Sequence, residues 1–266
     1  MTLADKLLLG AGAKSEPYVE FVSSTAMTIT PKYTNSGVTL QYSLDSSTWT
    51  TIATGATTPS ANIIYFRGQA TKTKALFTEN TPSNAWTFTG ATNLECNGKL
   101  DRLLQNTLGS DVNVLTIGNY CYSYMFSQVT QLIKAPALPA TTLSIFCYDN
   151  MFSGTNLVTA PALPATTLSN LCYANMLYGC TSLITAPALP ATVLANNCYN
   201  NMFYGCTSLK LSETMTGIYD TAYRIPTAGT GNLASNALFN MFLETGGTFT
   251  GTPTINTTYY TENTPV

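Results

Sequence analysis

The sequence predicts an α+β fold: an N-terminal antiparallel β-sandwich, then a solenoid with coils of 25–26 residues, and a β-rich C-terminal cap. Two observations lead to this prediction. The dipeptide Cys-Tyr recurs at Cys121, Cys147, Cys172 and Cys198, so that one unit repeats every 25 or 26 residues. Upstream of the repeats, short β-prone runs alternate with turn sequences. Repeats of this length indicate coils that bury their apolar faces only by stacking on one another.

These patterns divide the chain into four parts. Residues 1–16 are predicted to form an N-terminal arm that anchors the protein, and residues 17–90 form the β-sandwich. Residues 91–215 form the solenoid, and residues 216–266 form a degenerate last repeat and the cap. The apolar run in the arm covers only residues 7–9 and follows an acidic residue, so we do not expect it to be an export signal.

The β-sandwich prediction rests on six short runs of β-branched and aromatic residues, separated by Gly-, Ser- and Asn-rich turns. They are residues 17–22, 27–30, 38–43, 49–53, 63–67 and 86–89. Six or seven short strands in series are typical of a small antiparallel β-sandwich.

Each repeat is predicted to contain one short helix. The apolar residues of the fourth unit are Cys198, Tyr199, Met202, Phe203 and Cys206. Their spacing of i, i+1, i+4, i+5 and i+8 forms one face of a helix, and Gly205 is a typical residue at a helix end.

An extended segment follows each predicted helix. The sequence Ala-Pro-Ala-Leu-Pro-Ala-Thr begins at Ala135, Ala160 and Ala186, and each proline disfavours helix at the residue before it. One strand, one turn and one helix per coil predict a leucine-rich-repeat solenoid.

The repeats also resemble a known family. The run Met-Phe-Tyr-Gly-Cys-Thr-Ser-Leu, residues 202–209, resembles the leucine-rich repeat of bacterial surface proteins of the BspA type. The Ala-Pro-Ala-Leu-Pro-Ala-Thr segment is similar to a variant found in gut bacteria and their phages. The resemblance covers residues 90–245 and implies a leucine-rich-repeat fold, with adhesion as the expected role.

The composition excludes several classes of function. Only 9% of the residues are charged, against about 25% in an ordinary globular protein, and the net charge is −2. The 11 basic residues are scattered, so nucleic-acid binding is not expected. The absence of histidine excludes histidine-ligated metal sites and histidine acid–base catalysis. No run approaches the roughly 20 apolar residues of a membrane span.

The residues that could carry chemistry are predicted to be structural. The seven cysteines are expected to be buried free thiols, because neighbouring helix axes lie about 8–10 Å apart, too far for disulfides. Asp149 is the only charged residue between Ala135 and Leu209, and we expect Asp101, Asp111 and Glu95 to be solvated loop residues. The sequence therefore predicts no catalytic residue, cofactor or metal, and the protein is not expected to be an enzyme.

An uncharged face of amides and phenols is the candidate ligand-contact site. It comprises Asn170, Asn175, Tyr178, Asn196, Asn197, Asn200, Asn201 and Tyr204. Tyr and Asn side chains suit recognition of a carbohydrate or a protein, because they combine large contact area with adaptable hydrogen bonds. The alternative interpretation is that these residues only provide polar cover for the predicted helices. The sequence also leaves open whether a ligand would bind on the helix side or on the strand side of the solenoid.

The predicted function is that of a non-enzymatic phage virion protein, a fibre-like appendage located on the virion. The arm and the sandwich would bind other virion proteins, and the solenoid would bind a glycan or a protein of the host surface. The alternative is a BspA-type adhesin on a bacterial cell surface, which would need an export signal. The sequence leaves a homo-oligomer open for either function.

Overall fold

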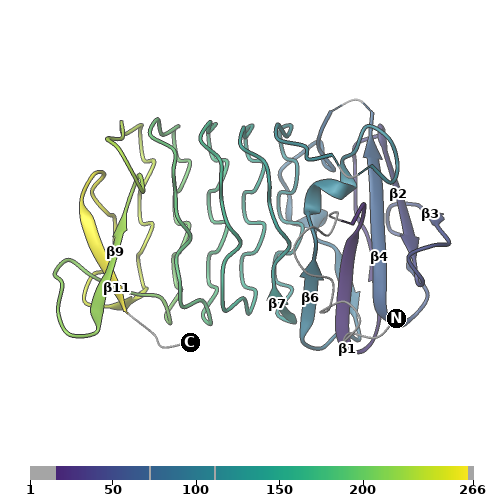
Figure 1. The fold of residues 1–266 in the computed structure, drawn as a ribbon, viewed down its shortest axis with the longest axis horizontal. Helices are drawn as coiled ribbons and strands as arrows, with labels where there is room; N and C mark the ends of the chain where they lie inside the picture. The colour runs from purple at the N-terminus through teal and green to yellow at the C-terminus, as the bar shows by residue number, and fades with distance from the viewer. Residues whose placement is uncertain (1–15, 72, 111, 263–266) are drawn as a thin grey trace.

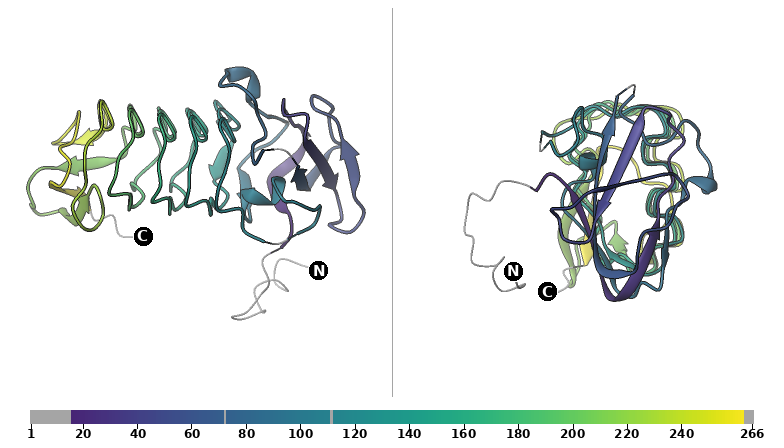
Figure 2. Two further views of the ribbon diagram at one scale, coloured as in Figure 1. Left: turned by 90° about the horizontal axis from the view of Figure 1, so that it is seen from above. Right: turned by 90° about the vertical axis from the view of Figure 1, so that its right-hand side faces the viewer.

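The repeats stack as coils along one axis, between a large sheet at the N-terminal end and a smaller sheet at the C-terminal end (Figure 1). The computed structural model describes residues 16–71, 73–110 and 112–262. The predicted arm of residues 1–16 thus lies outside the described residues, except for Glu16. The view along the axis in Figure 2 shows the coils superimposed on one another.

The predicted α+β fold and the leucine-rich-repeat solenoid are both wrong. The protein is nearly all β, with 28% of its residues in strands and 3% in helical turns. The helical elements of the described residues are the 3-10 turns η1 (Pro82–Asn84) and η2 (Leu100–Leu103). No continuous sheet runs through the described repeats, because the second and third coils contribute no strand to a sheet. The strands of the other coils are β7 (Leu132–Lys134) in the first, β8 (Lys210–Ser212) in the fourth and β10 (Gly246–Gly247) in the fifth.

A run of turns replaces the predicted helix in every repeat. In the first coil, the N–H groups of alternate residues bond to the carbonyl three residues back, as in Ser123 N to Tyr120 O (3.2 Å) and Met125 N to Tyr122 O (3.1 Å). The N–H groups between them bond to the next coil, as in Tyr122 N to Cys147 O (2.8 Å). Five such bonds join each pair of successive coils. A helix would instead use these donors within the coil.

Every fourth residue of this run has a left-handed backbone. These residues are Tyr120, Tyr124 and Gln128 in the first coil, Phe146, Asn150 and Gly154 in the second, Leu171, Asn175 and Gly179 in the third, Asn197, Asn201 and Gly205 in the fourth, and Asn236, Asn240 and Glu244 in the fifth. Their φ angles lie between +51° and +71°. Gly and Asn adopt this conformation at the lowest cost, which explains their frequency at these positions.

The predicted inward-facing residues of the repeats are confirmed as buried, although the backbone is not helical. Cys198, Tyr199, Met202, Phe203 and Cys206 are all fully buried. Equivalent residues of successive coils form columns along the stack. The rings of Tyr122, Tyr148, Tyr173 and Tyr199 stack at centroid distances of 5.8, 5.5 and 5.7 Å. Each column extends the apolar core through all the coils.

The N-terminal strands form one sheet rather than the predicted β-sandwich. They are β1 (Val19–Thr30), β2 (Val38–Ser43), β3 (Thr50–Ile52), β4 (Ala61–Ala70), β5 (Thr87–Thr89) and β6 (Leu94–Asn97). The order is β3-β2-β4-β1-β6-β7, with β5 paired to β1. Strands β6 and β7 pair in parallel, and β7 belongs to the first coil. The sheet therefore extends beyond residue 90, the predicted end of the β-sandwich, into the repeats. One face packs on that coil, where Phe21 lies 6.2 Å from Phe126 between ring centroids.

The C-terminal segment covers the last coil. The second sheet has the order β10-β8-β11-β9, with β9 (Tyr219–Arg224), β10 (Gly246–Gly247) and β11 (Thr258–Glu262). Phe242 of the fifth coil stacks on Phe203 at 5.3 Å, and the edges of Tyr223 and Phe249 pack against its ring. The Phe242 ring at the end of the stack is thus fully buried.

Candidate functional site

The predicted contact residues lie on the turn side of the stack, where several have structural roles. Asn175, Asn197 and Asn201 occupy left-handed positions, with φ angles of 52°, 54° and 51°. Asn adopts this conformation at a lower cost than most L-residues, so the backbone favours asparagine at these three positions. Asn170 and Asn196 are exposed, and Asn200 is half-buried.

Two tyrosines of the predicted face form a stacked pair. The rings of Tyr178 and Tyr204 lie 4.9 Å apart and 9° from parallel. The hydroxyl of Tyr204 donates a hydrogen bond to Glu244 Oε1 at 2.7 Å. Tyr178 keeps 39% of its surface exposed. The pair therefore links the third, fourth and fifth coils and exposes one phenol.

A hydrogen-bonded ladder connects the asparagines to a buried carboxylate. Asp149 is 3% exposed and accepts hydrogen bonds from the amides of Asn80 (2.9 Å), Asn150 (2.9 Å) and Asn175 (3.2 Å). The Asn201 amide donates to Asn175 Oδ1 at 3.2 Å. Burial raises the pKa of Asp149, and the amide hydrogen bonds oppose this shift. The ladder joins three coils and the loop before η1.

All seven cysteines are free and buried, as predicted. The Cys180 and Cys206 thiols each donate to a carbonyl of the preceding coil, at 3.1 Å to Phe152 O and to Leu177 O. Burial raises the pKa of the Cys198 thiol to about 12 and that of the other cysteines above its ordinary value. A buried thiol with a raised pKa is a poor nucleophile, because the thiolate is the reactive form.

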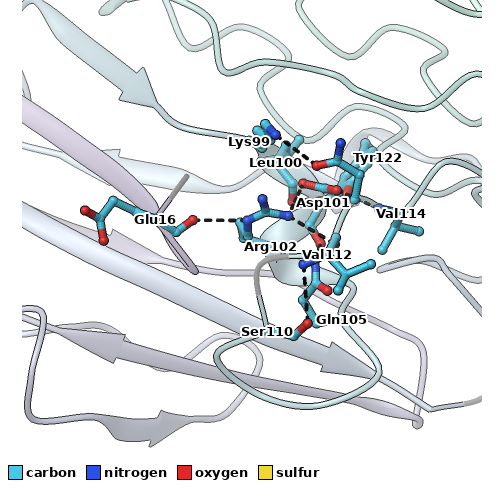
Figure 3. Close-up of polar contacts among 11 residues, drawn as sticks. Glu16, Lys99, Leu100, Asp101, Arg102, Gln105, Ser110, Val112, Val114 and Tyr122 are labelled. Atoms are coloured by element: carbon cyan, nitrogen blue, oxygen red, sulfur yellow. Dashed lines mark hydrogen bonds and ion pairs between the residues drawn. The ribbon is translucent and has the colours of Figure 1, made fainter. Parts of the chain in front are cut away.

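Figure 3 shows a second buried polar cluster, at the junction of the N-terminal sheet and the coils. Arg102 is fully buried and pairs with Asp101 Oδ1 at 3.1 Å. Its guanidinium also donates to Glu16 O (3.1 Å) and Val112 O (3.2 Å), and Val114 N donates to Asp101 Oδ2 at 2.7 Å. Burial raises the pKa of Asp101, against the hydrogen bond from Val114 and the charge of Arg102.

This cluster corrects one expectation from the sequence. Asp101 is not a solvated loop residue, because the backbone turn of η2 places it between the sheet and the first coil. Glu95 is 40% exposed and forms an ion pair with Lys134 at 3.4 Å. Asp111 lies outside the described residues. Within the part of the chain that the structure describes, no three His, Cys, Asp or Glu side chains gather as metal ligands.

The side of the stack formed by the Ala-Pro segments carries shallow depressions, and we call it the Ala-Pro face. It consists of residues 135–139, 160–164 and 186–190 with their neighbours. One depression of about 380 Å³ lies between the first two segments, and another of about 430 Å³ lies between the second and third. Two more, of about 440 and 470 Å³, lie beside Lys134. Ala137, Ala162 and Ala188 project outward at equivalent positions and are exposed.

Sequence reasoning did not single out this face as a site, although the repeated alanines were visible. The alternation of residues was the available signal. Leu138, Leu163 and Leu189 are buried at the same position of each segment, so the flanking alanines and prolines must face outward.

Comparisons of the chain with protein-family models, with curated proteins and with solved structures found no match. None of the helices in the described residues has the length and hydropathy needed to cross a membrane.

Proposed function

We propose that the protein is a non-enzymatic recognition protein, carried on a phage particle as an appendage, that binds the host surface through the Ala-Pro face. The observation that carries the proposal is the repetition of one uncharged surface, with exposed alanines and shallow depressions, along the axis of the stack. Successive coils present the same contacts at a fixed spacing. Weak contacts of this kind add up when several copies of the protein act together.

The chemistry of the repeats supports a binding role. The one charged group between Ala135 and Leu209, Asp149, is buried, and its two oxygens accept hydrogen bonds from three amides. The thiols are buried, and their pKa values are raised. A nucleophile or a general acid needs access to its substrate and a suitable pKa, so these groups are poorly suited to catalysis.

The cysteines support assembly of the protein in a reducing compartment. Seven unpaired thiols are unusual in a protein that folds during export, because oxidising compartments favour disulfides. A virion protein folds in the cytoplasm and leaves the cell at lysis. Burial then protects its thiols outside the cell. This observation favours the virion over the alternative, a BspA-type adhesin on a bacterial surface.

The location is tested by immunogold electron microscopy of the source culture, with an antibody raised against residues 135–209. Cells and filterable particles are imaged side by side. Gold on phage-like particles is the expected result, and its position on head or tail would identify the attachment site. Gold on the cell envelope would contradict the virion and support the adhesin.

The binding face is tested with two matched substitutions, each adding one negative charge to an exposed residue of the stack. Ala162→Glu lies between two depressions of the Ala-Pro face, and Asn170→Glu lies on the turn side. We expect Ala162→Glu to reduce adsorption of the protein to host cells at least about tenfold, because the charge must be desolvated on contact. Asn170→Glu should leave adsorption unchanged. The opposite pattern would assign binding to the turn side.

A further inference from the structure

The N-terminal sheet lies at the far end of the molecule from the C-terminal sheet (Figure 1), and its strand β4 (Ala61–Ala70) carries an arginine that the proposed function does not use. Arg67 belongs to β4, where Ile64 and Phe66 are buried against the core. Side chains alternate between the two faces of a strand, so Arg67 and Tyr65 project from the opposite face. Both are half-buried.

Neighbouring side chains hold the Arg67 guanidinium in place. It lies over the indole ring of Trp49, with 4.2 Å from Cζ to the ring centroid. Its Nε donates to Gln41 Oε1 at 2.8 Å, and the Gln41 amide donates to Thr51 Oγ1 at 3.5 Å. A guanidinium stacked on an indole is attracted by the electrons of the ring and loses rotational freedom.

The guanidinium groups of the other two arginines of the chain form ion pairs or hydrogen bonds within the fold. Arg102 is buried in its ion pair. Arg224 donates to Asn256 O and Oδ1 (both 3.3 Å), Pro226 O (2.9 Å) and Gly229 O (2.7 Å). Within the described residues, the Nη1 and Nη2 groups of Arg67 have no such partner. They form the free edge of an oriented guanidinium, which matches the two oxygens of a carboxylate.

A row of aromatic rings continues from Trp49, on which Arg67 stacks, through Tyr18 to Tyr65. The Tyr18 ring lies 5.9 Å from Trp49 and 5.1 Å from Tyr65, as centroid distances. Trp49 is half-buried, whereas the other tryptophan, Trp86, is 2% exposed within the core. Exposed Trp, Tyr and Arg side chains on one surface are typical of binding sites, because they offer large contact area at low entropic cost.

Gly109 lies beside the guanidinium and places no side chain on it. A Cβ atom at this position would lie 3.1 Å from Arg67 Nη1, and its φ angle is +74°. Any larger residue would crowd the guanidinium and strain the backbone.

We propose that Arg67, Trp49 and Gln41, with Tyr18 and Tyr65, form a binding site for a carboxylated sugar. The guanidinium binds the carboxylate through Nη1 and Nη2, and the sugar ring packs on the exposed aromatic rings. Gln41 and Thr51 are amide and hydroxyl groups suited to sugar hydroxyls. The proposed function, by contrast, rests on the Ala-Pro face. The site lies on a different surface, so the inference does not depend on the proposed function.

The test is titration of the full chain with methyl glucuronide, methyl glucoside and acetate, followed by calorimetry or NMR. The two sugars differ only at the carboxylate. We expect methyl glucuronide to bind at least about tenfold more tightly than either methyl glucoside or acetate. Equal binding of the two sugars would contradict the role of the guanidinium. Equal binding of acetate and methyl glucuronide would show a simple carboxylate site and would contradict the sugar.

Three variants locate the site. Arg67→Gln should weaken methyl glucuronide binding at least about tenfold, and Arg67→Lys should retain the charge but lose most of this affinity, because an ammonium cannot form two parallel bonds. Lys210→Gln removes one charge at the other end of the molecule and should bind as the wild type does. Thermal unfolding checks that each variant is folded. If Arg67→Gln does not fold, Arg67→Lys replaces it in the binding measurement. Wild-type affinity in a folded Arg67 variant would overturn the proposal.

Discussion

At the scale of single residues, the tyrosine column shows how one repeated side chain meets different surroundings. Tyr122 and Tyr199 occupy equivalent positions and both are buried. The Tyr122 hydroxyl donates to Leu100 O at 3.1 Å, whereas the Tyr199 hydroxyl is buried with no hydrogen-bond partner among the described residues. The repeat therefore retains a hydroxyl group that only some coils use.

This difference gives a matched pair of substitutions. We expect Tyr122→Phe to lower the unfolding free energy by about 1 kcal/mol, because Leu100 O loses its partner. Tyr199→Phe should be neutral or stabilising, because it removes a buried hydroxyl that lacks a partner. Urea denaturation of the two variants measures both effects. A larger loss for Tyr199→Phe would contradict the hydrogen bonding seen in the structure.

Asp149 makes the stability dependent on pH. Burial raises its folded-state pKa above the ordinary value of 3.8, so the native state takes up a proton before the unfolded state does. This contribution to stability is complete below about pH 4 and is lost as the pH rises through the folded-state pKa.

We therefore expect the unfolding free energy of the wild type, relative to that of Asp149→Asn, to rise as the pH falls from 7 to 4. Denaturant titrations at several pH values measure this difference. Asp101 titrates in both proteins and largely cancels in the comparison. A difference that stays constant with pH would contradict a raised pKa at Asp149.

At the scale of elements, the run of turns depends on its left-handed positions. Asn236 of the fifth coil has a φ of 52° and an exposed side chain, so substitutions there change the backbone preference and little else. We expect Asn236→Val to lower the unfolding free energy by about 1–2 kcal/mol and Asn236→Gly to leave it nearly unchanged.

A control for this prediction lies four residues earlier. Asn232 is exposed and pairs with Val193 in a parallel bridge, outside the left-handed positions. Asn232→Val should therefore leave thermal unfolding nearly unchanged. Equal losses for the two valine variants would argue against strain at position 236.

The turns also explain what could be predicted from the sequence. The repeat itself and the buried set of Cys, Tyr, Met and Phe were predictable, because they follow from the spacing and polarity of the residues. The helix was not, because a left-handed residue at every fourth position produces the same i, i+4 pattern. The available signal was the series Asn197, Asn201 and Gly205, since Asn and Gly favour positive φ.

The site around Arg67 could not be predicted for a different reason. Trp49 precedes β3, Gln41 lies on β2 and Arg67 on β4, so the pairing of strands brings them together. Register in a sheet depends on tertiary packing, which the local sequence does not determine. The single sheet was missed for the same reason, because β6 and β7 join it from beyond residue 90.

At the scale of the whole molecule, equivalent residues of successive coils stack in the same columns, so the coils on either side of a deleted coil could pack on each other in the same way. Deletion of residues 160–185 joins Thr159 to Ala186 and leaves Cys147 and Cys198 at a spacing of 25, as in a normal repeat. Asn201 would then take the place of Asn175 beside Asp149.

We expect this variant to fold cooperatively, with lower stability than the full chain, because each coil contributes its own contacts with its neighbours. Circular dichroism with thermal unfolding measures the stability, and small-angle scattering should show a shorter particle. An unfolded product would mean that the coils are not interchangeable.

The two long sides of the stack are held together differently. On the turn side, five backbone hydrogen bonds join each pair of coils. On the Ala-Pro face, no backbone hydrogen bond of the described residues joins residues 161–165 to the neighbouring segments, and the prolines have no N–H to offer. Opening the stack between residues 135–139, 160–164 and 186–190 breaks no backbone hydrogen bond between these three segments, although Ala137 and Leu189 stay bonded to Gly98, Leu100 and Thr227 beyond them. We therefore expect the coils to separate more easily along the Ala-Pro face than along the turn side, so that this face adapts to the curvature of a surface it contacts.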